Sequence, residues 1–538
     1  MTDAASAPAP ASAPAVRPTS PRGYVFAVCL VALVATSFAF IIRAFIIDDW
    51  ASEFGLSETQ KGELFGAGLW PFAISIIVFS LVIDRIGYGV AMWFAVACHV
   101  ASAIITINAS GYAELYIGNF ICALGNGTVE AVINPVIASM FWRHKTKWLT
   151  ILHAGWPGGL VVGGLLTLGM EPGNLFGSMG GATAADPIDW RWQVGLLLIP
   201  AVLYGVMLIF ARFPVSERVA AGVSYRAMLA EFGAVGMLIA AWLIFVELGR
   251  VWGWPGALTY ALIGVTVVGF GIASRSLGRP LFVFLLLVMI LLATTELGTD
   301  AWIKELMTPV MMDAFSIDGG WVLIYTASIM IVLRVFCGPF VKLFNPLGLL
   351  VLSSLFAAVG IAFLSTAAGI VILIAATIYG IGQTFFWPTT LGLVAERFPK
   401  GGALTLNAIA GVGMLGVGIL GAPLLGNIQD RHISAVVQAE QPELAPRVLA
   451  EEPKRSVIGS YRPLDADMLA ELDADEQQTV QAVQAGAKKS ALLQVAVLPL
   501  IMFFCYLGLL IGFKLTGGYK PEVLEAAHQG ETASENSG

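Results

Sequence analysis

Apolar runs of about 20 residues recur along nearly the whole chain, and no other feature constrains its fold as strongly. A run of this length crosses roughly 30 Å of hydrocarbon as an α-helix. Hydrophobic residues make up 57% of the 538 residues and charged residues only 12%, about half of their share in a soluble domain. The runs also lack the strict alternation of a membrane β-barrel. The sequence therefore predicts an all-α polytopic membrane protein.

The apolar runs form a first group of six, a central pair and a second group of six, which gives about 14 transmembrane helices. We expect the first six helices near 24–47, 62–83, 90–108, 113–140, 148–170 and 193–211. The central pair lies near 232–249 and 257–274, and the second six lie near 281–300, 320–340, 347–366, 369–393, 402–427 and 491–514. This arrangement predicts two six-helix halves with two additional helices between them.

The remaining segments complete the predicted domain organisation. The Ala-, Pro- and Ser-rich residues 1–22 cannot build a core and are predicted to be a disordered tail, and 516–538 is predicted to be a second one. The polar insertion 428–490 carries both charge signs and is interpreted as a solvated segment rather than a binding domain. The other predicted units are the N-terminal half (23–212), a linker with the two additional helices (213–280), five helices of the C-terminal half (281–427) and the last helix (491–515).

The lysines and arginines are unevenly divided between the two sides of the membrane. With the N-terminus inside, 16 of them fall in cytoplasmic segments and four in short external loops, which is the bias described by the positive-inside rule. The 16 are Arg17, Arg22, Arg85, Arg143, Lys145, Lys147, Arg212, Arg218, Arg226, Arg275, Arg279, Lys342, Arg397, Lys400, Lys514 and Lys520, and the four are Lys61, Arg191, Arg250 and Lys304. The sequence thus predicts an inner or plasma membrane protein with both termini cytoplasmic and 428–490 external.

Several function classes are disfavoured by what the chain does not contain. All five cysteines lie within apolar runs, which favours small core residues over a disulfide framework or a metal set. No CxxC, HExxH, GxxxxGK[ST] or GxSxG pattern occurs in a supporting context. We therefore expect no enzymatic activity, cofactor, bound metal or nucleic-acid partner.

Glu130, in the stretch "GNGTVEAVINP" (125–135), is a carboxylate whose burial costs free energy, and the long run around it holds almost nothing else that ionises. Burial penalises the charged form of a carboxyl group, so a proton can bind there. Glu130 is therefore predicted to be a proton-coupling carboxylate, the alternative being a hydrogen-bonded packing residue. Pro135 opens the backbone hydrogen-bond ladder of the same helix, and Asn134 could satisfy a freed group or bind substrate.

Two segments carry a resemblance to known transporters. The loop "DRIGYG" (84–89), in a chain of two six-helix halves, resembles that of the major facilitator superfamily. The segment 118–164 is similar to the fourth and fifth helices of the fucose–galactose–glucose:proton symporter family. It shares a Gly-x-Gly, a Glu four residues before Asn-Pro, a basic loop and a helix that ends in paired glycines. A weaker similarity to the tenth and eleventh helices of that family covers 382–418.

The resemblance implies a secondary active transporter that takes up a sugar or similar polar solute together with protons by alternating access. Its site is expected near the midplane between the halves. The implied partners are the small-molecule substrate, protons and the lipid bilayer, and the oligomeric state is open, with a monomer compatible.

The chain departs from the family pattern at two positions. His153 stands where the sugar symporters carry a glutamine that contacts the substrate, but imidazole can also bind a hydroxyl or transfer a proton. Arg43 stands near the position of an essential aspartate of the family. Its guanidinium either faces the cavity or extends outward to Asp48 and Asp49.

Further polar and aromatic residues are candidates for the lining of a polyol site, each with packing as the alternative. Trp156 offers a flat face for a pyranose ring, and Arg334 interrupts an apolar run. A spacing of four residues places Glu296 with Asp300, and Gln383 with Trp387, on common helix faces. The full predicted substrate-binding set is Arg43, Asn134, His153, Trp156, Glu296, Asp300, Arg334, Gln383, Trp387 and Asn407.

Two other functions stay open on the sequence alone. An organic-anion carrier or efflux antiporter is favoured if Arg43 and Arg334 both line the cavity. A non-transporting nutrient sensor could use the same fold. The intact Glu130 and the glycine-rich fifth helix, which indicates tight moving contacts, count against the sensor.

Overall fold

The computed structural model describes residues 20–524, except for 57, 171–173, 182, 184–187, most positions between 301 and 318, and 451, 457–458, 466–467 and 470. Residues 1–19 and 525–538, which make up most of the two predicted tails, lie outside the described residues.

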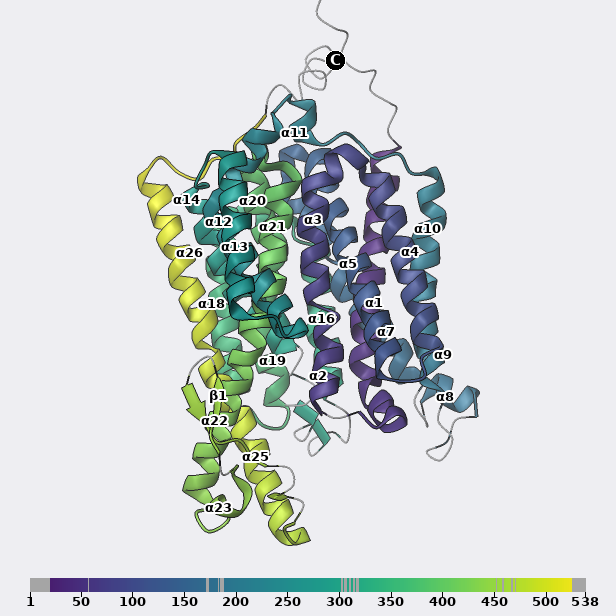
Figure 1. Cartoon of the computed structure of the whole chain (residues 1–538), viewed down its shortest axis with the longest axis vertical. Coiled ribbons are helices and arrows are strands. Elements are labelled where there is room, and N and C mark those ends of the chain that lie inside the picture. The colour runs from purple at the N-terminus through teal and green to yellow at the C-terminus, as the bar shows by residue number, and fades with distance from the viewer. Residues whose placement is uncertain are drawn as a thin grey trace, which may run out of the picture.

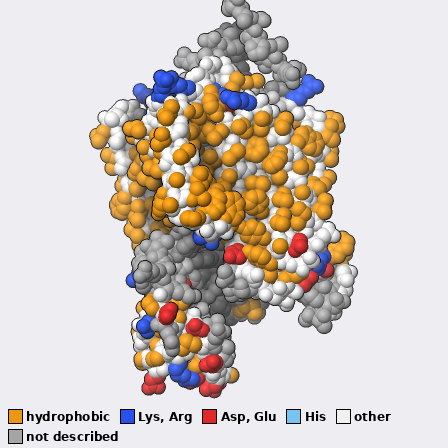
Figure 2. All heavy atoms as spheres, viewed as in Figure 1, with side chains coloured by type: hydrophobic (Ala, Val, Ile, Leu, Met, Phe, Trp, Pro, Cys, Tyr) orange, Lys and Arg blue, Asp and Glu red, His pale blue; other side chains and the backbone are white. Residues whose placement is uncertain are grey.

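The described chain is a bundle of long helices (Figure 1), and the face seen in Figure 2 is covered largely by hydrophobic side chains. Thirteen described helices are long and apolar enough to cross a membrane, and the shorter apolar helix Gly320–Val335 accompanies them. Each of the 14 predicted spans coincides with one of these helices. Apolar runs alone were therefore sufficient to locate the spans.

The N-terminal half contains α1 to α10. Its elements are α1 (Arg22–Phe54), α2 (Glu58–Gly66), α3 (Trp70–Ile86), α4 (Tyr88–Ile107), α5 (Tyr112–Met140), η1 (Trp142–His144), α6 (Lys145–Leu152), α7 (Gly155–Gly169), α8 (Leu175–Met179), α9 (Trp190–Gly195) and α10 (Leu198–Phe210). Glycines allow α7 to lie close against α1, because a Cβ on Gly159 would fall 1.8 Å from Ser37 Oγ and 2.9 Å from the Val34 carbonyl oxygen.

The C-terminal half contains α14 to α22 together with α26. Its elements are α14 (Pro280–Ala293), the π-helix η2 (Thr294–Gly298), α16 (Gly320–Val335), α17 (Gly338–Leu343), α18 (Pro346–Leu364), α19 (Val371–Gln383), α20 (Phe386–Arg397), η3 (Pro399–Gly401), α21 (Gly402–Gly416), the π-helix η4 (Val417–Gly421), α22 (Ala422–Glu440) and α26 (Val497–Leu515). The two halves contact each other mainly through α3 with α21, α6 with α20, and α7 with α16.

A short helix and the two additional spans connect the halves: α11 (Glu217–Ala220), α12 (Tyr225–Trp252) and α13 (Gly256–Ser274). Helix α12 packs against α3 of the first half and against α14 and α21 of the second. It bends at Gly233, whose φ of 66° suits glycine and whose missing side chain lets the backbone of Gly278 approach. Side chains of α13 such as Val265 and Ile272 are more than 70% exposed, so this helix presents an apolar face to its surroundings.

The predicted insertion 428–490 is more ordered than a solvated loop. Helix α22 continues the eleventh core span to Glu440, and the antiparallel helix α25 (Ala474–Val495) leads back into α26. Between them lie α23 (Ala445–Val448) and a two-stranded antiparallel sheet of β1 (Lys454–Ser456) and β2 (Gly459–Tyr461). A small core of its own contains Ile433, Val437, Ala445, Val448, Leu449, Leu472, Val480 and Ala487. Helices α22 and α25 thus run across the predicted boundaries at 427 and 491, and the boundaries of the insertion remain a prediction.

The insertion protrudes from one end of the bundle, and both described chain ends lie near α11 at the other (Figure 1). Ser20 N donates to the Arg212 carbonyl at 3.1 Å, and Glu522 N donates to the Glu396 carbonyl at 2.7 Å. The position of both described chain ends at the same end of the bundle agrees with the predicted even number of membrane crossings. That the α11 end faces the cytoplasm remains a prediction.

Candidate functional site

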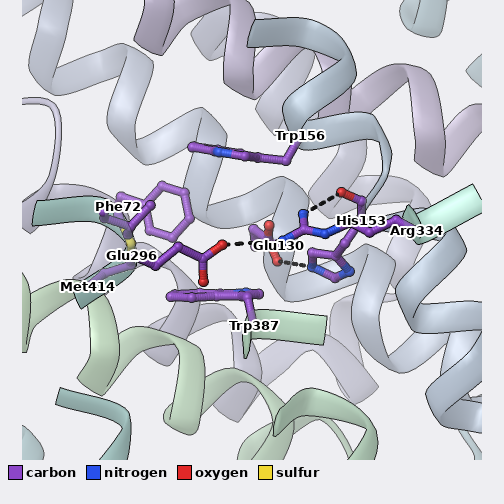
Figure 3. A pocket seen from close by; sticks show the side chains of 9 residues that line it. Phe72, Glu130, His153, Trp156, Glu296, Arg334, Trp387 and Met414 are labelled. Carbon is purple, nitrogen blue, oxygen red and sulfur yellow. Dashed lines mark hydrogen bonds and ion pairs between the residues drawn. The ribbon is translucent and has the colours of Figure 1, made fainter. Parts of the chain in front are cut away.

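A cavity of about 30 Å³ lies in the middle of the bundle where the two halves meet (Figure 3). It is lined from the N-terminal half by Phe72, Glu130, His153 and Trp156, and from the C-terminal half by Glu296, Leu297, Arg334, Trp387 and Met414. The structure thus brings together Glu130 and five residues of the predicted substrate-binding set, which come from separate spans of both halves. The volume suffices for one or two water molecules but not for a sugar.

Two Trp-Pro pairs break the spans that line this cavity. The predicted helices 148–170 and 369–393 are each interrupted, the first between α6 and α7 and the second between α19 and α20. Pro157 and Pro388 lie just after these breaks. A proline has no N–H to donate to the carbonyl four residues earlier, so the carbonyls of His153 and Thr384 lose that donor, although Trp156 N still donates to the His153 carbonyl at 3.3 Å.

Arg334 supplies the missing donors at both breaks. From α16 its Nη1 donates to the His153 carbonyl at 2.8 Å and its Nε to the Thr384 carbonyl at 2.7 Å. Its Nη2 lies 3.2 Å from Glu296 Oε1, and the side chain is 1% exposed. The planar fork of the guanidinium allows one side chain to reach two carbonyls and a carboxylate. Arg334 therefore joins a helix break of each half to a buried carboxylate.

A third proline has a comparable partner. Pro135 lies inside α5, and the carbonyl it leaves without an N–H is that of Ala131. Asn407 Nδ2, on α21 of the other half, donates to this oxygen at 3.0 Å. The prediction that Asn134 could satisfy the freed group is not met, since Asn134 Nδ2 donates instead to Glu130 Oε2 at 2.7 Å. Both asparagines are completely buried: Asn134 binds the Glu130 carboxylate, and Asn407 binds the Ala131 carbonyl.

Glu130 lies between Asn134 and the imidazole of His153. Its Oε2 is 3.8 Å from His153 Nε2, and the glutamate is 3% exposed. His153 Nδ1 lies 2.9 Å from the Leu149 carbonyl, an acceptor, so Nδ1 carries a hydrogen. The imidazole therefore presents its other nitrogen, Nε2, to the Glu130 carboxylate.

Glu296 projects from the π-helix η2, a widened turn that is common at functional sites. The hydroxyls of Thr294 and Thr295 donate to the carbonyls of Ile290 and Leu291 at 2.7 and 2.8 Å. Asp300 follows one turn later but does not line the cavity. Its Oδ1 accepts a hydrogen bond from the Tyr379 hydroxyl at 3.4 Å.

The indoles of Trp156 and Trp387 lie on opposite sides of the cavity with Glu296 between them (Figure 3). Trp156 also packs against Phe40, with the ring centroids 5.8 Å apart. Gln383 and Trp387 were predicted to share a helix face, but the break between α19 and α20 lies between them. Trp387 lines the cavity, whereas Gln383 is buried and does not.

Arg43 lies apart from this cluster. Its Nη1 donates to Asn119 Oδ1 at 3.0 Å, and its side chain lines a different cavity, inside the N-terminal half. It does not extend outward to Asp48, which pairs with Lys61 at 2.8 Å. The helical run around Arg43 gave no indication of which neighbour its side chain would meet.

A family model described as Major Facilitator Superfamily matches residues 26–423, about three quarters of the chain. The chain belongs to the major facilitator superfamily. No curated protein of established function shows significant sequence similarity to it. The predicted fold of two six-helix halves with two additional helices is confirmed.

Solved structures of other major facilitator proteins share this fold at low sequence identity. A single-residue variant of the Escherichia coli fucose:proton symporter FucP is 14% identical with a TM-score of 0.54, over 90% of this chain and 99% of that one. The proton:xylose symporter XylE bound to 6-bromo-6-deoxy-D-glucose is 16% identical with a TM-score of 0.55, over 90% and 96% of the chains. The human organic anion transporter MFSD10 is 12% identical with a TM-score of 0.52, over 90% and 100%.

In this major facilitator protein the α11 end is closed by polar contacts between the halves and the linker. Lys145 Nζ lies 2.7 Å from Glu217 Oε2 and donates to the Ala395 carbonyl at 3.2 Å. Arg218 Nε donates to Asp84 Oδ2, in the "DRIGYG" loop, at 3.0 Å. Thr146 Oγ1, in the N-terminal half, donates a hydrogen bond to Glu396 Oε1, in the C-terminal half, at 2.5 Å. Both residues of the Lys145–Glu217 pair are less than 10% exposed, so this pair is largely shielded from water.

Several residues of the site were missed in the sequence. Phe72, Leu297 and Met414 line the cavity, but each is an ordinary apolar residue in an apolar helix. The roles of Pro157 and Pro388 were readable, because each follows a tryptophan inside a long span and a proline there must free a carbonyl. The donor to that carbonyl could not be read, since it comes from a distant helix.

Proposed function

We propose that this protein is a secondary active transporter that carries a sugar or similar small polar solute together with protons by alternating access. The observation that supports this most directly is the pair of Glu130 and His153 in a cavity between two indole faces, at the junction of two halves of a transporter fold. The solute class is also supported by the fucose and xylose named for the distant relatives FucP and XylE.

Proton coupling would rest on Glu130. The charges of Arg334 and Glu296 offset each other at 3.2 Å, so Glu130 and His153 are the remaining titratable pair of the cavity lining. A proton that enters from the acidic side neutralises Glu130 or forms an imidazolium facing its carboxylate. In either case the pair becomes electrically neutral, and reorientation through the low-dielectric bundle requires less free energy than with an unpaired carboxylate.

The solute would be held by aromatic faces and by charged hydrogen-bonding groups. The indoles of Trp156 and Trp387 offer flat apolar surfaces to the C–H face of a sugar ring. The carboxylates of Glu130 and Glu296 accept hydrogen bonds from hydroxyls. An anionic solute fits less well, because the guanidinium of Arg334 already donates to two carbonyls and to Glu296, and Arg43 lies outside this cavity.

The small size of the cavity supports the proposal of alternating access. A solute larger than two waters requires the halves to separate, which breaks the Arg334–His153 and Asn407–Ala131 bonds at the centre. Release at the α11 end additionally breaks the Lys145 and Thr146 contacts. On this proposal the structure corresponds to a state that is closed at the α11 end.

The test is transport by purified protein in proteoliposomes, with a panel of radiolabelled monosaccharides and organic acids, with and without a pH gradient. We expect gradient-stimulated accumulation of one or more monosaccharides. Glu130→Gln mimics the protonated carboxyl and should abolish gradient-driven uptake while solute counterflow persists. Glu247→Gln, a buried carboxylate of α12 that pairs with Arg250, is the matched control and should leave coupling intact. Normal gradient-driven accumulation by Glu130→Gln would overturn the coupling role.

A further inference from the structure

A second cavity, also of about 30 Å³, lies inside the N-terminal half and away from the proposed transport site. It is bounded by α1, α4, α5 and the α9–α10 segment, and its polar lining consists of Arg43, Ser102, Thr106, Asn119 and Cys122, with Trp50 beside them. Asn119 and Glu130 both belong to α5 and are separated by about 16 Å along its axis. The cavity is therefore distinct from the central one.

The guanidinium of Arg43 has no carboxylate partner among the described residues. The side chain is 5% exposed, and its Nη1 donates to the neutral side-chain amide of Asn119 at 3.0 Å. Asp48, the carboxylate on the same helix that is nearest in sequence, pairs with Lys61. An arginine keeps its charge in proteins, and an uncompensated buried charge is strongly destabilising. A counter-charge inside the cavity would remove this penalty.

The other unsatisfied groups around the cavity are of one kind. Among the described residues, no hydrogen-bond partner reaches the buried atoms Arg43 Nε, Trp50 Nε1 and Asn119 Nδ2, and all three are donors. The acceptor of the Asn119 amide is already used by Arg43. All three residues line the cavity, and unsatisfied donors, one of them on a cation, are groups that can coordinate an anion.

The space around the guanidinium restricts the size of such an anion. About 30 Å³ holds a single small ion or one or two waters, so an organic carboxylate larger than formate does not fit. Gly68 borders the guanidinium so closely that a Cβ there would lie 2.1 Å from Arg43 Nη1. The glycine therefore leaves room for the arginine without widening the cavity.

We infer that this cavity binds a small monovalent anion, with chloride as the abundant candidate, between Arg43, Trp50 and Asn119. Water would satisfy the three donors but would leave the buried charge uncompensated. The bound anion ties α1 to α5 within the N-terminal half and stabilises that half without contacting the transported solute.

The test is thermal unfolding of the full-length protein in detergent, in potassium gluconate and with increasing replacement by potassium chloride or bromide at constant ionic strength. The midpoint of unfolding should rise with halide and saturate, because a ligand that binds only the folded state stabilises it. Arg43→Gln should abolish this rise. Trp50→Phe, which retains an aromatic ring, should raise the half-saturating chloride concentration about tenfold.

Arg447→Gln is the matched control, since it removes an exposed cation of the insertion that pairs with Glu476. It should keep the wild-type halide response. Equal halide responses in Arg43→Gln and Arg447→Gln, or no response of the wild-type protein to either halide, would overturn the inference. If Arg43→Gln does not fold, Trp50→Phe decides: an unchanged half-saturating concentration then counts against the site.

Discussion

The side-chain amide of Asn407 donates a 3.0 Å hydrogen bond to the carbonyl of Ala131, the oxygen that Pro135 leaves without a helical partner. Arg334 makes the same kind of contact to the carbonyls freed by Pro157 and Pro388. Two of these three oxygens belong to the first half, whereas both donors belong to the second. Prolines in the cavity helices therefore create the acceptors through which the halves hold each other, and these acceptors must find water when the halves separate.

A double-mutant cycle tests the Asn407 contact. Asn407→Leu leaves the Ala131 carbonyl buried without a donor and should lower the free energy of unfolding by about 1–3 kcal/mol. Pro135→Ala restores an N–H at position 135, so in that background Asn407→Leu should cost clearly less. Denaturation of the four proteins in detergent measures the coupling. Equal losses in the two backgrounds would mean that the amide does not compensate for the proline.

Replacing Arg334 by lysine should nearly abolish transport, although the charge is retained. A single ammonium cannot span the two carbonyls and Glu296, which the guanidinium fork contacts at 2.7 to 3.2 Å. Arg334→Gln should also destabilise the protein by about 3–5 kcal/mol, because Glu296 is left as an unpaired buried charge. The added substitution Glu296→Gln should recover folded protein in the membrane but not uptake. Wild-type counterflow by Arg334→Lys would contradict this assignment.

The two indoles are expected to contribute to solute affinity through their faces. Trp156→Leu and Trp387→Leu should each raise the KM for the best sugar about tenfold, a loss of about 1.4 kcal/mol, whereas Trp156→Phe and Trp387→Phe should have smaller effects. Initial rates of uptake at graded solute concentration supply the values. Trp93→Leu, at a site that is 46% exposed on α4, controls for general effects of losing an indole. Unchanged KM in both leucine variants would leave the aromatic faces without a role.

Cys337 can report on opening at the α11 end. It is completely buried, and its Sγ lies 3.7 Å from the Lys147 carbonyl of the other half. Lys145→Gln breaks the buried contact with Glu217 and should accelerate alkylation of Cys337 by a maleimide severalfold, with the other four cysteines replaced by alanine. Lys61→Gln, which breaks the pair with Asp48 away from this end, should not. The same slow alkylation in both variants would show that the Lys145 pair does not control this end.

The orientation predicted from the cationic bias can be measured with two single cysteines. Arg462→Cys should react with an impermeant maleimide added outside intact cells, because its side chain is exposed and it belongs to the insertion, which protrudes from the end opposite α11. Arg226→Cys, which is exposed beside α11, should react only after permeabilisation. The reverse pattern would place both termini outside.

The sequence was sufficient where a property belongs to one helix and insufficient where it depends on two. Apolar length located all 14 spans, and the cost of burying Glu130 singled it out before its neighbours were known. The partner of the Ala131 carbonyl could not be predicted, because Asn134 is near in sequence whereas Asn407 is near in space. The position of Arg43 along its helix could be predicted from the sequence. The direction in which its side chain points could not, because it depends on how α1 is rotated about its axis relative to α5.

The insertion is carried by α22 and α25, which run from the membrane-spanning helices without an intervening flexible loop. Helix α22 continues from the span that holds Asn407, through the π-turn Val417–Gly421. Any rotation of the C-terminal half therefore moves α22 and α25 together with the folded insertion that they carry outside the bundle (Figure 1). A displacement of a few ångströms at the buried cavity becomes a larger displacement of the insertion, which lies in water. A fluorophore attached to the insertion can therefore report each transport cycle.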